Sequence, residues 1–309
     1  MNDKQINMLI QNRAKKKFYG HKKLYSKYAP QIPLTAEREL VRLMRSYISG
    51  ILRSELEEKL PKIKEIYKKE RDLRTRGFRK DDETDFMIAV AAVMTEIQNG
   101  ITAKTEGFGL RKKLEVMAQL NRKLTIKEWK KACKATLGIN ILEDYYLDDF
   151  YAEGMQQWVE YNVDLIKTIP QEYFDKIREV IDTGYIEGRT TTEISKEIRK
   201  IYGVSKRRAD FIARDQCAKL NGQISRAQQV DAGLNEYIWS DSGDSRVRAS
   251  HRALNGHKFS WDEPPENADG RCCHPGEDYG CRCVAIPVFE YDYINLPIDT
   301  SEEVDYIES

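Results

Sequence analysis

Apolar residues recur at three- and four-residue steps through the first three quarters of the chain, which is the spacing of amphipathic helices. Thr35 is expected to cap one helix, Pro61 to divide it from a basic one, and Gly100 and Gly203 to act as stops. The segment 86–94 is apolar on nearly every side, so we expect a buried central helix there. The expected helices cover 5–18, 35–60, 61–75, 82–99, 110–122, 125–138, 142–168, 170–184, 190–203 and 205–232.

Two of these helix starts carry a stronger signal. Thr125 with Glu128, and Thr190 with Glu193, have the spacing of a capping box, in which each side chain bonds the backbone N–H of the other residue. The sequence therefore predicts a helix N-terminus at both places.

The pattern changes after Gly233, where alternation replaces helical spacing and loops occupy much of the chain. Short strands are expected over 235–240, 259–261 and 283–289. The expected fold class is α+β, mostly α: an N-terminal helical region followed by a small loop-rich module that contains β-strands. Such a module has few large apolar residues for a core of its own, and a bound metal is a common remedy.

Length and composition fit two soluble domains: 309 residues, 40% hydrophobic and 33% charged. We expect no apolar stretch of the ~20 residues that a membrane span needs, and no secretory signal at the N-terminus. The chain is divided into a basic N-terminal arm at 1–33, a helical domain at 34–165 and a C-terminal domain at 166–309. The last contains helices at 170–232, a Cys/His module at 234–290 and an acidic tail at 291–309.

The net charge of +1 conceals two oppositely charged regions. Residues 1–80 hold 22 Lys and Arg against 9 Asp and Glu, whereas the rest of the chain holds 29 against 41. The basic region suits non-specific contacts with the phosphates of double-stranded DNA, and a solvated charged helix is the alternative. The residues expected to bind DNA are Lys15, Lys16, Lys17, Lys22, Lys23, Lys62, Lys64, Lys68, Lys69 and Arg71.

Histidine and cysteine gather in one stretch: three of the four histidines and four of the six cysteines fall within 239–283. Thiolate and imidazole are the usual ligands of structural zinc. Cys281 and Cys283 are one residue apart, so an extended chain points both thiols to the same side. The predicted zinc ligands are His251, Cys273, Cys281 and Cys283, with His274 as the alternative fourth ligand.

Two alternatives to zinc remain open, namely unliganded thiols and a disulfide from Cys272 or Cys273 to Cys281. A cytosolic origin would keep thiols reduced, which favours the metal over the disulfide. The other two cysteines, Cys133 and Cys217, lie on helical stripes and are expected to be small core residues.

Asp244, Arg248 and His251 fall within one short stretch, where Asp244 suits the N-cap of a helix that carries the other two. A catalytic interpretation would need a nucleophile and a pocket. The sequence contains no Gly-x-Ser-x-Gly elbow, no phosphate-binding loop and no zinc-deaminase pattern. A metal-dependent nuclease needs an open coordination position, whereas this cluster has enough ligands to close the shell. We therefore expect no enzyme activity and keep the nuclease as the enzyme alternative.

An ordered set of residues runs through the last part of the chain. It consists of Gly188, Thr191, Glu193, Ile194, the Ile-Ala-Arg run at 212–214, Ala232, Gly233, Tyr237, Trp239, Asp244, Arg248, His251, Leu254, Gly256 and the Cys-Arg-Cys triplet at 281–283. This set resembles the C-terminal signature of the Mu F-like minor head proteins, also called head morphogenesis proteins, of tailed bacteriophages. The resemblance covers about 180–290. One departure is Asp215-Gln216, where the family usually has Thr-Glu.

The resemblance implies a non-enzymatic virion protein that binds the portal, enters the head with it and touches packaged DNA during head assembly and genome delivery. Contacts with the scaffold or the major capsid protein would belong to the same role. The implied location is the head interior near the portal, after synthesis in the host cytoplasm. A cytosolic DNA-binding accessory protein without a virion role is the non-enzymatic alternative.

The helix expected at 142–168 carries several aromatic residues, including Tyr145, Tyr151, Trp158 and Tyr161. Such a stripe packs either inside a bundle or against a partner. Tyr145 and Trp158 lie on different sides of one helix, so at least one large ring is expected to be left for a partner. Trp158 and Tyr161 are the hypothesis for the surface that docks on the portal.

Overall fold

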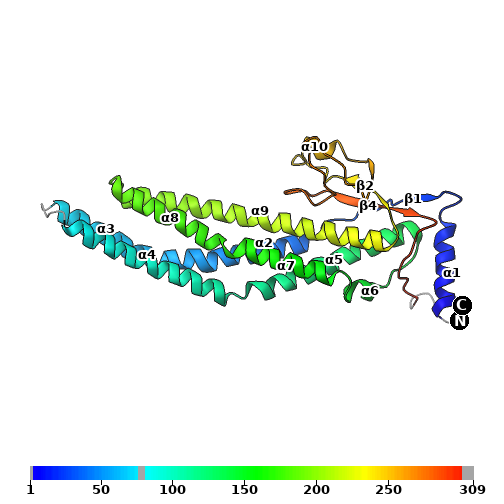
Figure 1. The fold of residues 1–309 in the computed structure, drawn as a ribbon, viewed down its shortest axis with the longest axis horizontal. Helices are drawn as coiled ribbons and strands as arrows, with labels where there is room; N and C mark the ends of the chain where they lie inside the picture. The colour runs from blue at the N-terminus through cyan, green and yellow to red at the C-terminus, as the bar shows by residue number, and fades with distance from the viewer. Residues whose placement is uncertain (1–2, 76–80, 301–309) are drawn as a thin grey trace. The chain divides into compact units, whose positions relative to one another are not determined.

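The structure, a computed structural model, describes residues 3–75 and 81–300 and is mostly helical with one small antiparallel sheet (Figure 1). The chain forms two compact units whose segments interleave. Unit 1 comprises residues 1–39, 115–158 and 214–309, and unit 2 comprises 40–114 and 159–213. The domain boundaries drawn from the sequence follow chain order instead, and they stay a prediction.

The helices follow one another closely along the chain. They are α1 (Asp3–Lys16), α2 (Leu34–Ile48), the π-helix η1 (Ser49–Arg53), α3 (Ser54–Thr75), α4 (Asp81–Gly107), α5 (Leu110–Leu137), α6 (Glu143–Leu147), α7 (Ala152–Lys167), α8 (Ile169–Ile186), α9 (Thr191–Asp231) and α10 (Ala249–Arg252). The strands are β1 (Lys23–Tyr25), β2 (Glu236–Ser240), β3 (Lys258–Ser260) and β4 (Val284–Glu290).

One of the two predicted capping boxes is present. At the start of α9, Glu193 accepts a hydrogen bond from the Thr190 N–H at 2.8 Å, and Thr190 Oγ1 accepts one from the Glu193 N–H at 3.3 Å. The other prediction is wrong, because α5 runs unbroken through Thr125. The Thr125 hydroxyl is buried and lies 2.9 Å from both the Asn121 carbonyl and Asn221 Oδ1. A tertiary polar contact has replaced the local cap.

Several predicted helix boundaries are also wrong. α4 continues through Gly100, where any side chain would collide with the carboxylate of Glu55 on α3. α9 continues through Gly203, since a single glycine costs a helix only about 1 kcal/mol. Pro61 lies inside α3, and the irregularity falls earlier, at η1. α2 begins at Leu34, so Thr35 is a helical residue and not its cap.

Unit 2 is built around the apolar faces of α2, η1, α3, α4 and α8. Tyr47 is fully buried and lies edge-on to Phe108, with ring centroids 4.9 Å apart. The Tyr67 hydroxyl of α3 donates to the Ile181 carbonyl of α8 at 2.8 Å. Inside this bundle Glu55 is 2% exposed and forms ion pairs with Lys59 and Lys104.

Helix α4 is only partly buried, contrary to the sequence prediction for 86–94. Met87 and Ile88 are 44% and 62% exposed. By length and composition alone Asp85–Gly107 could span a membrane, which the sequence analysis did not expect. A core helix meets the same criterion, and six apolar residues of α4 are buried within unit 2: Phe86, Val90, Val93, Met94, Ile97 and Ile101.

The N-terminal arm contributes to the core of unit 1. Ile10 and Phe18 of this arm are 1% exposed and share a cluster with Trp129 of α5 and Phe289 of β4, whose rings stack at 5.8 Å. The stretch after α1 supplies β1, a strand that the sequence analysis did not predict. Cys133 lies in this core, as predicted.

The four strands form one sheet in the order β1-β4-β2-β3, and each neighbouring pair is antiparallel. The three predicted strands are present within one or two residues of their expected bounds. Alternation along β2 buries Tyr237 and Trp239, which pair in register with Pro287 and Ala285 of β4. The sheet thereby places the residues just before β4 beside those after β2.

The predicted aromatic helix is divided into α6 and α7 by a turn in which Tyr151 has a φ of 62°. Trp158 is 6% exposed, and its Nε1–H donates to the Gln216 carbonyl at 3.1 Å within unit 1. It is therefore a core residue, and its proposed place on a docking surface is wrong. Tyr161, in contrast, is 57% exposed.

Candidate metal centre

His251 lies on the short helix α10, and it is 2% exposed. Trp239 of β2 lies edge-on to its ring at a centroid distance of 5.5 Å. Asp244, predicted to cap this helix, lies outside it: its carboxylate accepts the Arg246 N–H at 2.9 Å and pairs with Arg282 at 2.6 Å. The Arg282 hydrogen bond, with that backbone N–H, lowers the pKa of Asp244 to about 2. Asp244 therefore ties the loop before α10 to the Cys-Arg-Cys triplet.

Gly256 returns the chain from α10 to the sheet. Its φ of 78° lies in the left-handed region that glycine adopts without strain. The Gly256 N–H donates to the Trp239 carbonyl at 2.8 Å, and the Trp239 N–H donates to the His257 carbonyl at 2.9 Å. Backbone hydrogen bonds thus tie Trp239 of β2 to Gly256 and His257, which positions α10 next to β2.

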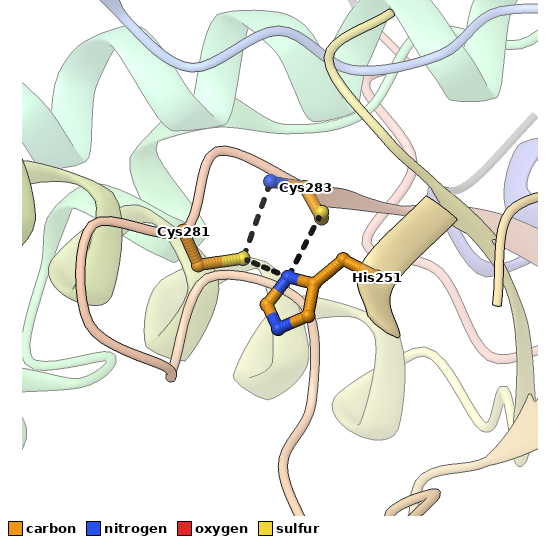
Figure 2. A group of neighbouring side chains, drawn as sticks. All are labelled: His251, Cys281 and Cys283. Carbon is orange, nitrogen blue, oxygen red and sulfur yellow. Dashed lines mark hydrogen bonds between the residues drawn. The ribbon is translucent and has the colours of Figure 1, made fainter. Parts of the chain in front are cut away.

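Cys281 and Cys283 precede β4 and converge on one nitrogen of His251 (Figure 2). The distances from His251 Nδ1 are 3.5 Å to Cys281 Sγ and 3.6 Å to Cys283 Sγ. Both thiols are 4% exposed. We call these three residues the thiol–imidazole centre.

The backbone around Cys281 favours a thiolate. The N–H groups of Gly276 and Cys283 both point at Cys281 Sγ, at 3.4 Å. A hydrogen bond from the Cys283 thiol, together with those from His251 and the two N–H groups, lowers the pKa of Cys281 despite its burial. The same contact raises the pKa of Cys283, and the contact with Cys281 raises the pKa of His251.

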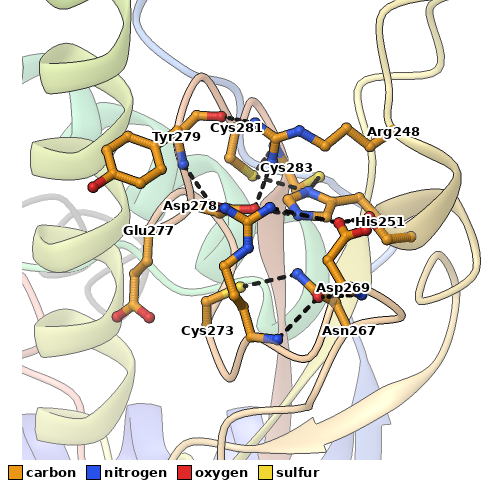
Figure 3. Close-up of polar contacts among 12 residues, drawn as sticks. Arg248, His251, Asn267, Asp269, Cys273, Glu277, Asp278, Tyr279, Cys281 and Cys283 are labelled. Carbon is orange, nitrogen blue, oxygen red and sulfur yellow. Dashed lines mark hydrogen bonds and ion pairs between the residues drawn. The ribbon is translucent and has the colours of Figure 1, made fainter.

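Asp278 lies on the opposite side of the imidazole (Figure 3). Its Oδ2 is 3.1 Å from His251 Nε2 and accepts a hydrogen bond from Arg248 at 2.5 Å. Its Oδ1 accepts the Tyr279 N–H at 2.8 Å and pairs with Arg271 at 3.1 Å. Burial alone would raise the pKa of Asp278, but these partners outweigh burial and lower it. The carboxylate is therefore charged and held between two arginines and the imidazole.

The remaining predicted ligands, Cys273 and His274, are not part of the thiol–imidazole centre. Cys273 is buried and forms a second group with His251 and Asp278, in which the candidate ligand atoms lie within 4.8 Å of one another; burial raises its pKa to about 11. His274 is in neither group: its Nδ1 is 3.0 Å from the Tyr237 hydroxyl. Cys272 is exposed, and all six cysteines are free. The identity of a fourth ligand stays a prediction.

The loop that carries Cys281 is anchored on α9. The Gly280 N–H donates to Asp215 Oδ1 at 2.6 Å, and Lys219 pairs with Asp215 Oδ2 at 2.9 Å. Gly222 allows a close approach, because a side chain there would lie 2.8 Å from the Pro275 carbonyl oxygen. From the sequence, position 215 stood out only as a departure from the family, and Asp278 was missed. The position of Asp278, close in sequence to Cys281 and Cys283, was the available signal.

The predicted DNA-binding residues are divided between the two units. Lys23 pairs with Glu236 at 2.6 Å and Lys62 with Glu96 at 2.9 Å, so both are already engaged. Lys15 lies 5.0 Å from the ring centroid of Tyr291. Arg71 lies on α3 and is one of the residues that line a hollow in unit 2. The rest have no ion pair with any residue in the described ranges: Lys16, Lys17, Lys22, Lys64, Lys68 and Lys69.

Residues 175–286 match the family model described as phage Mu protein F like protein. The resemblance to the phage head morphogenesis family is confirmed. The matched residues run from α8 to β4 and include all three residues of the thiol–imidazole centre. The Mu F-like segment is thus the part of the chain that includes α9, β2 and the loop that carries Cys281 and Cys283.

Three curated proteins show the extent of similarity. An uncharacterized protein of Haemophilus influenzae is 37% identical over 145 residues, which cover 46% of this chain and 32% of that protein. "Minor head protein GP7" of Bacillus phage SPP1 is 24% identical over 212 residues, 59% of this chain and 68% of that protein. An uncharacterized protein of Methanocaldococcus jannaschii is 31% identical over 134 residues, 43% of this chain and 20% of that protein. The chain spans about a third and a fifth of the two uncharacterized proteins. No solved structure matches it at a significant level.

Proposed function

We propose that this protein is a minor head protein of a tailed bacteriophage, located in the head interior near the portal after synthesis in the host cytoplasm. The supporting observation is the Mu F-like segment at 175–286, joined by similarity to the SPP1 minor head protein over 59% of the chain. In this role the protein binds the portal and contacts packaged DNA during head assembly and genome delivery. The scaffold and the major capsid protein are further candidate partners.

Co-sedimentation with heads tests this role. Full-length tagged protein should be found in purified heads of its phage, and a portal pull-down should retain it. A protein that is expressed and soluble but absent from heads would overturn the proposal in favour of a cytosolic DNA-binding accessory protein.

Two basic hollows are our proposed DNA contacts. The hollow in unit 1, of about 690 Å³, is lined by Lys15, Lys16 and Lys22, with Asp292 as its carboxylate. Tyr19, whose side chain is 81% exposed, also lines it. Lysines supply phosphate contacts, and an exposed ring can stack on a base.

The hollow in unit 2, of about 480 Å³, is lined by Lys64, Lys68, Arg71 and Arg189, with Glu70 as its carboxylate. Lys64 and Lys68 have no ion pair with any described residue, whereas Arg189 already pairs with Glu187. The two lysines are therefore the cations that a phosphate backbone would neutralise.

Charge-neutral variants test the two hollows separately. Lys16→Gln with Lys22→Gln, or Lys64→Gln with Lys68→Gln, should weaken binding to random-sequence duplex DNA in low-salt mobility shifts. Each lost phosphate contact should reduce the slope of log affinity against log salt by about 0.9.

The matched control is Lys167→Gln with Lys200→Gln, which removes the same charge from lysines paired with Asp164 and Glu197. Equal weakening by the control would mean that DNA responds only to net charge. A wild-type chain that shifts no DNA at low salt would remove DNA from the proposed role.

Tyr161 is the residue we propose for portal docking, now that Trp158 is assigned to the core. Its ring is 57% exposed on α7, and aromatic rings are enriched at the energetic centres of interfaces. Tyr161→Ala should leave the protein folded and reduce its recovery on immobilised portal. Normal recovery would end the claim for this residue.

A further inference from the structure

The thiol–imidazole centre brings together three donors that suit one kind of ion. Two sulfurs and one imidazole nitrogen, all buried, meet without a disulfide between them. We propose that the centre binds one zinc ion through His251 Nδ1, Cys281 Sγ and Cys283 Sγ, and that Asp278 is a positioning residue that holds the imidazole from its Nε2 side. This inference concerns the protein's own stability and does not depend on the proposed role in the phage head.

The spacing of the donors matches the ion. Zinc lies about 2.3 Å from a thiolate sulfur and about 2.0–2.1 Å from an imidazole nitrogen, so a tetrahedral angle places the two ligand atoms about 3.5 Å apart. The distances from His251 Nδ1 to the two sulfurs are 3.5 and 3.6 Å. The single lone pair of Nδ1 can accept only one S–H hydrogen bond well, so the convergence of two sulfurs on this one nitrogen favours an ion between them.

The polar surroundings supply what a zinc thiolate site needs. Cys281 Sγ faces two backbone N–H groups at 3.4 Å, which offset the negative charge of a thiolate. On the other side, Asp278 can accept the Nε2 proton of His251 at 3.1 Å, which leaves the lone pair of Nδ1 directed at the thiols. Zinc-binding histidines almost always have such a partner on their second nitrogen.

Asp278 itself cannot join the same three donors through this oxygen, because Oδ2 faces the nitrogen on the far side of the ring. Its contacts with Arg248 and Arg271 fix the carboxylate in place. Both arginines therefore act on the metal only through Asp278 and His251. This order of contacts distinguishes ligands from positioning residues and can be tested.

The same geometry resembles a Cys–His–Asp catalytic triad, in which an imidazole lies between a thiol and a carboxylate. Two observations favour the metal. Cys281 and His251 are 4% and 2% exposed, which leaves a substrate no access to the sulfur. A nucleophile also has no use for the second thiol of Cys283 at the same nitrogen, whereas a metal does.

The test uses the full-length protein, stripped with a chelator and reloaded with zinc alone or with Co²⁺ as a spectroscopic probe. Elemental analysis should give about one zinc per chain, and cobalt should give the absorption of a tetrahedral site with thiolate ligands. Cys281→Ser and Cys283→Ser should lose the ion. Cys133→Ser and Cys272→Ser, at a buried and an exposed cysteine outside the centre, should keep it.

Asp278→Asn provides the second arm and keeps all three ligands. Zinc affinity should fall about 10–100-fold, while the cobalt spectrum retains its thiolate bands. Unchanged affinity would remove Asp278 from the proposal.

If the serine variants fail to fold, alkylation of the wild-type chain decides the matter. In loaded protein Cys281 and Cys283 should be protected, and chelation should expose them. The inference is overturned if folded wild-type protein takes up no zinc. It is also overturned if Cys281 alone reacts rapidly with the alkylating reagent, as a nucleophile would. Neither result affects the co-sedimentation and portal pull-down tests of the proposed function.

Discussion

The bundle of unit 2 and the Cys/His module of unit 1 bury their residues by different means. In unit 2, apolar residues recur at helical spacing, and a central Glu55 is neutralised by two lysines on α3 and α4. In the Cys/His module, the small core consists of Tyr237, Trp239, Trp261, Ala285 and three cysteines. Neighbours in the bundle come from local repeats, whereas His251 meets its partners across thirty residues of chain.

The two kinds of core are vulnerable to different changes. A helix bundle spreads its stability over many apolar contacts, so the loss of one contact is tolerated. A loop-rich module with few large apolar residues depends on a small number of strong links. The following experiments separate the two regions by the size of the response, beginning with the largest.

Removing the proposed zinc should have the largest effect, and it should be confined to the module. Because binding to a structural zinc site also drives folding, with apparent values of about 10–16 kcal/mol in small zinc domains, chelation should unfold the module around β2 and β4. Fluorescence of the buried Trp239 and Trp261 should change, while most of the helical circular dichroism remains. Helices and tryptophan signals that melt together would contradict the comparison.

Trp158→Ala should be the next largest. Truncating a buried tryptophan costs about 3–5 kcal/mol, because it leaves a cavity and here also the Gln216 carbonyl without its donor. Tyr161→Ala, three residues further along α7, is the exposed control and should change stability by less than about 0.5 kcal/mol. Chemical denaturation measures both, and equal losses would mean that burial does not distinguish the two rings.

Glu55→Gln probes the charged centre of unit 2 through pH. Burial raises the pKa of Glu55, but the ion pairs with Lys104 and Lys59 outweigh burial and lower it below its ordinary value. A lowered folded-state pKa gives stability that is present above the unfolded pKa of about 4.3 and is lost as pH falls through the folded pKa.

At neutral pH the Gln variant should therefore be less stable by about 1–3 kcal/mol, and the gap should close in acid. Thermal melts of both proteins from pH 7 to pH 3 measure this gap. A gap that stays constant with pH would show that the loss comes from packing and not from charge.

The smallest effects come from a pair of helix glycines that should respond with opposite signs. Gly203→Ala meets no neighbouring atom within 4 Å and should stabilise α9 by about 0.5–1 kcal/mol. Gly100→Ala should destabilise unit 2 by about 1–3 kcal/mol, because the new methyl group meets the Glu55 carboxylate. Equilibrium denaturation distinguishes the signs, and two stabilising variants would contradict the packing of α3 against α4.

The elements with local signals could be predicted from the amino-acid sequence. The mostly helical α+β class, the Thr190–Glu193 capping box and the three C-terminal strands follow from periodicity and caps, which act within a few residues. Which of these signals counted depended on contacts that form only in the folded chain. Gly100 lies inside a helix, where the Glu55 carboxylate occupies the space that a side chain would need. Trp158 lies in the core of unit 1, where it donates a hydrogen bond to the Gln216 carbonyl. The same holds for the candidate centre. The residue types and their spacing predicted His251, Cys281 and Cys283 as ligands. The roles of Asp278 and Asp215 could be recognised only in the structure, where the pairing of β2 with β4 and the contact with α9 position the loop before β4. Contacts between residues distant in sequence depend on how the intervening loop brings them together, and no local sequence pattern specifies that arrangement.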